Sequence, residues 1–181
     1  MPVRTLLLLA IFLGGCSWKA RVKHLGDEEF KHYYALKPFM SEETEKGFLT
    51  LKTEEERTEY LKSIKIERVP PINLYDVFYQ YPDNIRQLIV DGAVQEGWAK
   101  DMVLMAWGAP YDKKKLVGRP APRSEMLIYK FEKHEDGSVL VFIPGSKTEY
   151  KAVERFTREV ILDADVVTEI VEKSGWGSGG A

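Results

Sequence analysis

Apolar residues recur at two different periods along this chain. Between residues 27 and 107 they return every three or four positions, which is the spacing of amphipathic helices. Beyond residue 124 they return every second position, as in strands with one buried face. The change in period predicts an α+β fold in which N-terminal helices pack on an antiparallel sheet of three to four strands.

Capping residues indicate where the helices begin. Asp27, Ser41 and Thr53 each open a stretch of helical period, and Thr53 forms a capping-box pattern with Glu56. Gly108 ends the last stretch, where we expect a residue with positive φ. The predicted helical stretches are 27–36, 41–49, 54–64, 74–80, 83–91 and 102–107.

Two of these stretches are rich in aromatic residues. In the first, Phe30, Tyr33 and Tyr34 share one stripe. The second group could form a binding stripe, although core packing is the interpretation we favour. Its members are Tyr75, Phe78, Tyr79 and Tyr81.

Two alternating runs predict a β-hairpin. Residues 125–132 and 138–143 flank a turn that contains Asp136-Gly137, a pair that favours tight turns between strands. Because the run 138–143 is apolar on both faces, we expect a central strand there. The segment 111–124, which precedes the hairpin, is expected to be a loop.

The last part of the chain predicts two further strands. Residues 154–162 form the third strand, and Asp163-Ala164-Asp165 forms a turn. Residues 166–172 fit a strand or a helix, and we expect an edge strand. We expect one domain over 27–172 and a flexible, glycine-rich tail over 173–181.

The first fifteen residues have the pattern of an export signal. Arg4 precedes an apolar run that is too short to span a bilayer. The tetrapeptide Leu13-Gly14-Gly15-Cys16 resembles a bacterial lipobox, in which a signal peptidase recognises the first three residues and the cysteine receives the lipid. A buried free cysteine is the alternative interpretation.

We therefore expect a signal peptide over 1–15, a lipidated Cys16 and a tether over 16–26. Two or three acyl chains would hold the protein firmly in a membrane. Ser17 stands where an Asp would resemble the inner-membrane retention signal of enteric bacteria. The expected address is the bacterial outer membrane, facing the periplasm.

Composition excludes several classes of function. The 26 Lys and Arg residues balance 28 Asp and Glu residues, so no basic field exists to gather nucleic acid. One cysteine allows neither an internal disulfide nor a cysteine-based zinc site. With 44% hydrophobic residues in 181, the chain can fill one core.

No catalytic or cofactor motif is visible in the sequence. The chain lacks a Gly-x-Ser-x-Gly elbow, a phosphate loop and a His-Glu-x-x-His motif. His24, His32 and His134 are far apart, so a metal site would depend on folding to gather them. Carboxylates that could pair as acid and base are equally scattered, at Glu67, Asp76, Asp101 and Asp112. We expect a protein that is not an enzyme and has no metal or cofactor.

The expected loop over 111–124 is strongly basic. Beside a membrane it could contact anionic headgroups or a partner protein. The alternative is a solvated loop stiffened by prolines. Its five cations are Lys113, Lys114, Lys115, Arg119 and Arg123, beside one anion, Asp112.

One short motif carries a family resemblance. Gly97-Trp98-Ala99-Lys100-Asp101, followed by Gly108-Ala109-Pro110 and Asp112, resembles the GWxTD-domain family of bacterial envelope proteins, with Lys100 in place of the family's Thr. The run from Val94 to Pro110 is also similar to the SmpA/OmlA (BamE-type) lipoproteins of the outer-membrane β-barrel assembly machine, with Trp98 where Met is usual.

The two resemblances imply a periplasm-facing lipoprotein that acts through contacts and has no catalytic residue in the motif. The motif residues have structural explanations. Gly97 suits a tight entry, Gly108 a helix end and Pro110 a rigid exit. We expect an accessory or scaffolding component of an envelope assembly with an unidentified protein partner. The alternatives are a ligand-binding or sensing module with a concave apolar pocket, and, ranked last, an envelope hydrolase.

Overall fold

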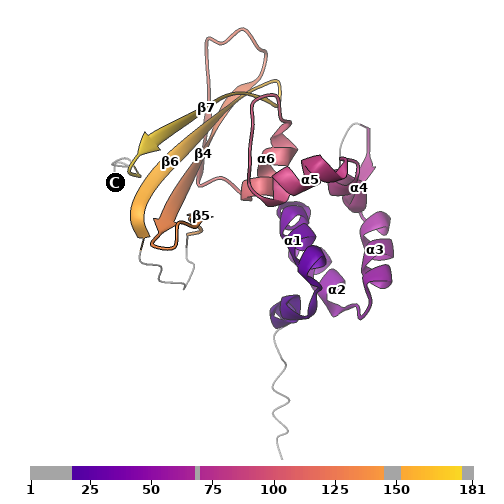
Figure 1. Cartoon of the computed structure of the whole chain (residues 1–181). Helices are drawn as coiled ribbons and strands as arrows, with labels where there is room; N and C mark the ends of the chain where they lie inside the picture. The colour runs from indigo at the N-terminus through magenta and orange to yellow at the C-terminus, as the bar shows by residue number, and fades with distance from the viewer. Residues whose placement is uncertain (1–17, 68–69, 145–151, 177–181) are drawn as a thin grey trace, which may run out of the picture.

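The computed structural model describes residues 18–67, 70–144 and 152–176, and its architecture is the predicted α+β fold. The N-terminal half is helical, and the C-terminal half forms an antiparallel sheet that lies beside the helices (Figure 1). The lipobox residues, Leu13 to Cys16, lie outside the described residues.

Every predicted helical stretch is confirmed, with ends that differ by one or two residues. The tether predicted before residue 27 contains a further 3₁₀-helix. The bounds are η1 Trp18–His24, α1 Asp27–Leu36, η2 Lys37–Phe39, α2 Glu42–Thr50, α3 Glu54–Ser63, α4 Leu74–Tyr79, α5 Asp83–Val90 and α6 Lys100–Trp107.

Side chains cap α2 and α3 as predicted. The Ser41 hydroxyl accepts a hydrogen bond from the backbone N–H three residues on, at 3.1 Å. Thr53 accepts from the Glu56 N–H, and the Glu56 carboxylate accepts from the Thr53 N–H, both at 3.2 Å, which completes the capping box. At α1 the prediction was wrong in detail, because Gly26 occupies the cap position and Asp27 is the first helical residue. At this position the Asp27 carboxylate interacts favourably with the positive end of the helix dipole.

A small ribbon between α3 and α4 was not predicted. Strand β1, Lys65–Ile66, pairs antiparallel with β2, Ile72–Asn73. The ribbon lies where Pro70 and Pro71 interrupt the helical pattern of the sequence. Asn73 then caps α4 by accepting from the Asp76 N–H at 2.7 Å. The ribbon thus returns the chain to the helical layer.

Five strands form the main sheet of the described residues. Their order is β3-β4-β6-β7, and β5 pairs with the same side of β4 as β3 does. The longest pairing, between β4 and β6, forms the centre of the sheet. The bounds are β3 Asp112–Lys115, β4 Ser124–His134, β5 Val139–Val141, β6 Ala152–Asp163 and β7 Val166–Ser174.

Three predictions about the sheet need correction. The run 138–143 is not central, because β5 has three residues and lies at the edge. The segment 111–124 is not all loop, since its first part forms β3. Residues 173–176 do not belong to a tail: β7 extends to Ser174, and the Trp176 indole donates to the Phe131 carbonyl at 3.0 Å. The predicted edge strand at 166–172 is confirmed as part of β7.

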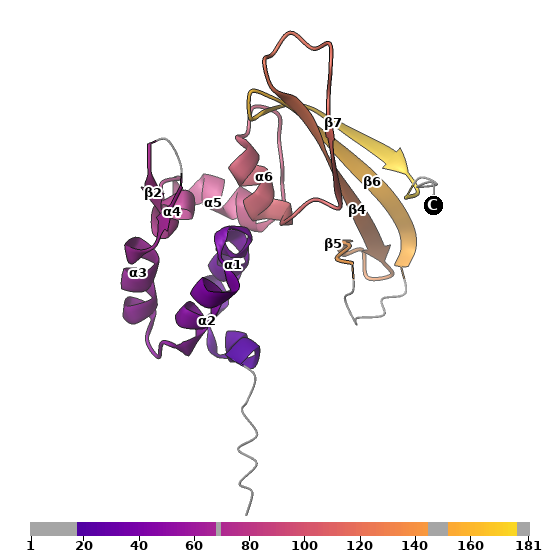
Figure 2. The ribbon, with the colours of Figure 1, turned by 180° about the vertical axis from the view of Figure 1, so that it is seen from behind.

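One face of the sheet packs against α6. Leu127, Tyr129 and Phe131 alternate along β4 toward this face and are almost fully buried. The Trp107 ring packs edge-on against the Tyr129 and Phe131 rings, with centroids 5.1 Å apart in each case. In both views α6 lies between the other helices and the sheet (Figures 1 and 2).

Backbone pairing also joins the two halves. The Gly97 N–H donates to the Val167 carbonyl, and the Val167 N–H donates to the Trp98 carbonyl, both at 2.8 Å. Ala99 forms an antiparallel bridge with Val166. The segment that leads into α6 therefore adds a short antiparallel pairing to the first residues of β7.

Gly108 ends α6 in a conformation reserved for glycine. Its φ of 75° confirms the predicted sign, and its ψ of −156° places it outside the ordinary left-handed region. A Cβ built at Gly108 meets no atom within 4 Å, so the cost of any side chain arises from the backbone conformation.

We expect Gly108→Ala to lower the free energy of unfolding by about 1–3 kcal/mol. The matched control is Gly26→Ala, because Gly26 has a φ of −62° and equally open space around its Cβ position. Because Gly26 is the N-cap of α1, where alanine is less favourable than glycine, that change should cost no more than about 1 kcal/mol, with no contribution from a positive φ. Denaturant unfolding of both variants checks this, and equal effects would contradict the conformational explanation.

Candidate binding cleft

An apolar cleft of about 560 Å³ opens where the helices meet the sheet. It is lined by residues of α1 and η2, by the ends of α5 and α6, and by the segments 108–111 and 142–144. The volume falls within the range of about 300–1,000 Å³ that is usual for small-molecule sites. The cleft therefore has the dimensions of a binding site.

The lining is apolar except at two lysines. Lys31 and Lys37 are its charged residues, and no described lining residue is acidic. Lys37 pairs with Glu45 at 3.3 Å and lies over the Tyr33 and Tyr34 rings. Lys31 is exposed on α1.

Exposed apolar side chains form the rim of the cleft. The exposed fractions are 47% for Tyr34, 46% for Tyr111 and 66% for Ile143, all of which line it. Phe30, one turn before Tyr34, is also exposed and packs edge-on against it at 4.9 Å. Contiguous exposed apolar surface of this kind marks interaction sites.

The single stripe predicted for α1 is divided in the structure. Tyr33 is 2% exposed and donates a hydrogen bond to the Glu45 carboxylate, whereas Phe30 and Tyr34 point outward. Burial and the Glu45 carboxylate raise the pKa of Tyr33 above its usual value, so the hydroxyl stays protonated. Tyr33 is thereby fixed in the core, and its two neighbours are left at the surface.

The five cations of the predicted loop have different environments. Arg119 forms a two-pronged ion pair with Asp163, which also accepts from Ser124 at 2.6 Å. Arg119 and Ser124 hold the pKa of Asp163 well below its usual value. Arg123 pairs with Asp165 at 3.1 Å on the surface. The remaining three, Lys113, Lys114 and Lys115, lie exposed on β3.

This basic region lies far from the start of the described chain. In both views the connection from β3 to β4 is at the top of the molecule and η1 is at the bottom (Figures 1 and 2). Lys115 and Arg123 line a separate hollow of about 420 Å³ together with Lys100 and Glu125, which form an ion pair. The exposed lysines on β3 also protect a sheet edge from pairing with other chains.

The family-motif residues lie at the junction of helices and sheet. Gly97 has a φ of 84°, and Trp98 is buried with an exposed fraction of 6%. Pro110 lines the cleft, and the Gly108 carbonyl accepts from the Tyr129 hydroxyl at 3.0 Å. Asp101 lies in α6, and Asp112 begins β3. These positions agree with a structural role for the motif.

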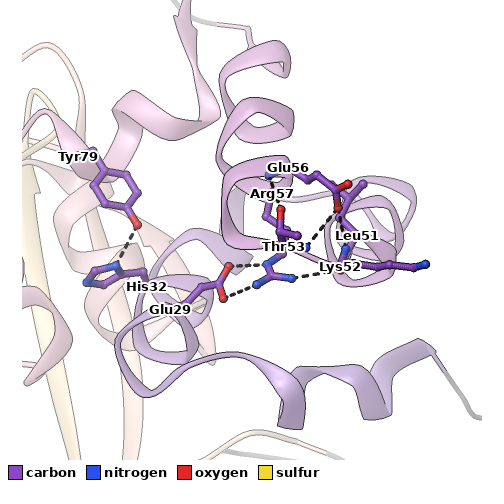
Figure 3. A network of polar contacts seen from close by, with 8 residues as sticks. All are labelled: Glu29, His32, Leu51, Lys52, Thr53, Glu56, Arg57 and Tyr79. Atoms are coloured by element: carbon purple, nitrogen blue, oxygen red, sulfur yellow. Dashed lines mark hydrogen bonds and ion pairs between the residues drawn. The ribbon is translucent and has the colours of Figure 1, made fainter.

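A polar network holds α1 against α3 and α4 (Figure 3). Arg57, 8% exposed, forms a two-pronged ion pair with Glu29 and donates to the Leu51 carbonyl at 3.1 Å. His32 Nδ1 and the Tyr79 hydroxyl are 2.9 Å apart. Burial raises the pKa of Tyr79 to about 12. The network encloses a water-sized cavity of about 10 Å³, too small for a substrate.

The residues considered for chemistry are not gathered. His24, His32 and His134 lie in η1, α1 and β4, respectively. The four candidate carboxylates are also separate: Glu67 follows β1, Asp76 is in α4 beside its capping Asn73, and the other two are in α6 and β3. Within residues 18–67, 70–144 and 152–176, no group of three His, Cys, Asp or Glu side chains could hold a metal ion.

No protein-family model, curated protein or solved structure matches the chain. Among the described helices, none is both long and apolar enough to cross a bilayer.

The cleft could not be found from the sequence because its residues come from four segments that are far apart along the chain. No local signal pointed toward it. Phe30, Tyr33 and Tyr34 have the spacing of one buried stripe, and only tertiary packing decides which of the three rings stays at the surface.

His32 predicts a loss of stability in acid. Burial, and then the Arg86 cation, lower the pKa of His32 below its usual 6.5, so the unfolded chain binds a proton more readily. The stabilisation is present above pH 6.5 and is lost as the pH falls through the folded value. We expect His32→Gln to reduce the decline in unfolding free energy between about pH 7 and pH 5.

The control for this titration is His24→Gln, on the exposed η1. It should keep the wild-type pH profile in denaturant titrations. Identical profiles for the two variants would contradict the role of His32.

Proposed function

We propose that this chain is a lipid-anchored protein of the bacterial outer membrane that faces the periplasm and acts by binding, as an accessory or scaffolding component of a cell-envelope assembly. The observation that carries the proposal is the apolar cleft with its exposed aromatic rim. The helix-then-sheet order agrees with the resemblance to GWxTD-domain and BamE-type lipoproteins. Catalysis has no part in the proposed function.

An anchor at Cys16 would set the orientation of the protein. Two peptide steps separate Cys16 from Trp18, a reach of about 7 Å, so η1 would lie next to the membrane. The connection from β3 to β4, which carries basic residues, would then lie at the end of the molecule away from the membrane (Figure 1). We therefore assign them to a protein partner in preference to the membrane of the anchor.

A ligand-binding module is the second candidate, and one observation favours it. The cleft is concave and apolar, with two lysine ammonium groups beside it, which is the usual composition of a small-molecule site. Both candidates use the same surface.

We expect Cys16→Ala to leave an unprocessed or misplaced protein, because the cysteine sulfur is the attachment point for lipid. Mass spectrometry of the exported protein checks this. An intact Met1 or an unmodified Cys16 in the wild-type protein would contradict the assignment.

We expect Ala106→Phe to fill part of the cleft and to abolish specific capture of an envelope component from crosslinked membranes. Ala106 is partly exposed and lines the cleft, so the added ring has space there. The matched control is Lys46→Phe, which adds the same ring to an exposed position of α2, outside the cleft.

Both variants should unfold at temperatures close to that of the wild type. Capture that is lost only in Ala106→Phe supports a binding function for the cleft. Equal capture by all three proteins would contradict it.

A further inference from the structure

We propose that the cleft holds the acyl chain of an anionic lipid, with the headgroup at Lys31 and Lys37. This assignment rests on the binding function proposed above, and it names the ligand.

Charge is the first argument. The whole chain has more acidic than basic residues, with a formal net charge of −2, yet the described lining of the cleft has two lysines and no carboxylate. Glu45 is ion-paired with Lys37, but it also binds the Tyr33 hydroxyl and lies largely buried. The Lys31 ammonium is exposed. The lining itself therefore carries two ammonium groups and no carboxylate, which favours an anionic headgroup.

The shortage of hydrogen-bonding groups is the second argument. Besides the lysines, the lining side chains with polar hydrogens are Tyr34, Tyr111 and Trp107. The Trp107 indole already donates to the Gly92 carbonyl at 2.8 Å. An extended peptide would bury backbone N–H and C=O groups against this apolar lining, which is costly. An acyl chain has no such groups.

The size of the cleft favours an acyl chain over a buried helix. A helix satisfies its own backbone but is about 10 Å across, so 560 Å³ would hold only about one turn of it. An acyl chain is thin enough to lie along the cleft. The exposed rings of Tyr34 and Phe30 continue the apolar surface for a chain longer than the cleft.

The test uses the lipidated, full-length mature protein in nanodiscs of phosphatidylcholine. The probe is palmitate with a photoreactive diazirine at the end of its chain, and the comparison compound is the methyl ester of the same molecule. Peptide mass spectrometry after irradiation locates the label. We expect the acid to label peptides that contain Met105 to Trp107 or Phe142 to Pro144, and the ester to label them at least fivefold less.

Variants separate the chain site from the headgroup site. Ala106→Phe should remove the label from these peptides. Lys31→Gln and Lys37→Gln should each weaken binding of the acid about fivefold, as expected for one cation beside an anionic group. The control Lys46→Gln changes an exposed lysine outside the cleft and should leave the label unchanged.

Label spread evenly over the chain, equal labelling by acid and ester, or equal labelling of the lysine variants and their control would overturn the lipid assignment. If Ala106→Phe still abolishes capture of an envelope protein, the binding function stands and the ligand is a protein. If neither capture nor labelling responds to Ala106→Phe, both proposals fail.

Discussion

Backbone pairing between the segment that leads into α6 and the start of β7 is the constraint on which the rest of the molecule depends. Gly97, Trp98 and Lys100 exchange three hydrogen bonds of 2.8 Å with the turn and strand at 165–167. This pairing fixes where α6 begins, and α6 positions Trp107 on the sheet. The cleft forms where α1, which packs on α6, lies opposite the segment 142–144 that follows β5.

The helical half is fixed by polar contacts as well as by its core. A buried ion pair such as Arg57–Glu29 contributes little net stability, but either partner left alone would be strongly destabilising. The pair therefore specifies how α1 meets α3. With Tyr33 held by Glu45, the same helix can bury one aromatic face only. Phe30 and Tyr34 remain at the surface as a consequence of this packing.

Local patterns in the sequence predicted the helices well because their signals are local. The capping box at Thr53 and the glycine at 108 depend on a few neighbouring residues, and both have the predicted form. The run 138–143 was misjudged because strand position depends on distant partners: β6 pairs with the other side of β4, leaving β5 at the edge. Its apolar side chains serve in part to line the cleft.

The candidate site could not be predicted in the same way. Lys31 and Lys37 looked like ordinary surface charges of a helix, and nothing local connects them with Trp107 or Ile143. Tertiary packing alone brings these residues together. The basic residues that the sequence singled out instead lie at the opposite end of the molecule from η1 (Figure 2).

The central claim is that the cleft between helices and sheet is occupied in the cell envelope. The most direct measurement is photocrosslinking in living cells, with benzoylphenylalanine placed at Tyr34 in the cleft and, for comparison, at the exposed Val153 on β6. We expect a discrete crosslinked product, lipid or protein, from position 34 and none from position 153. Absence of a product at position 34, or the same products from both positions, would contradict it.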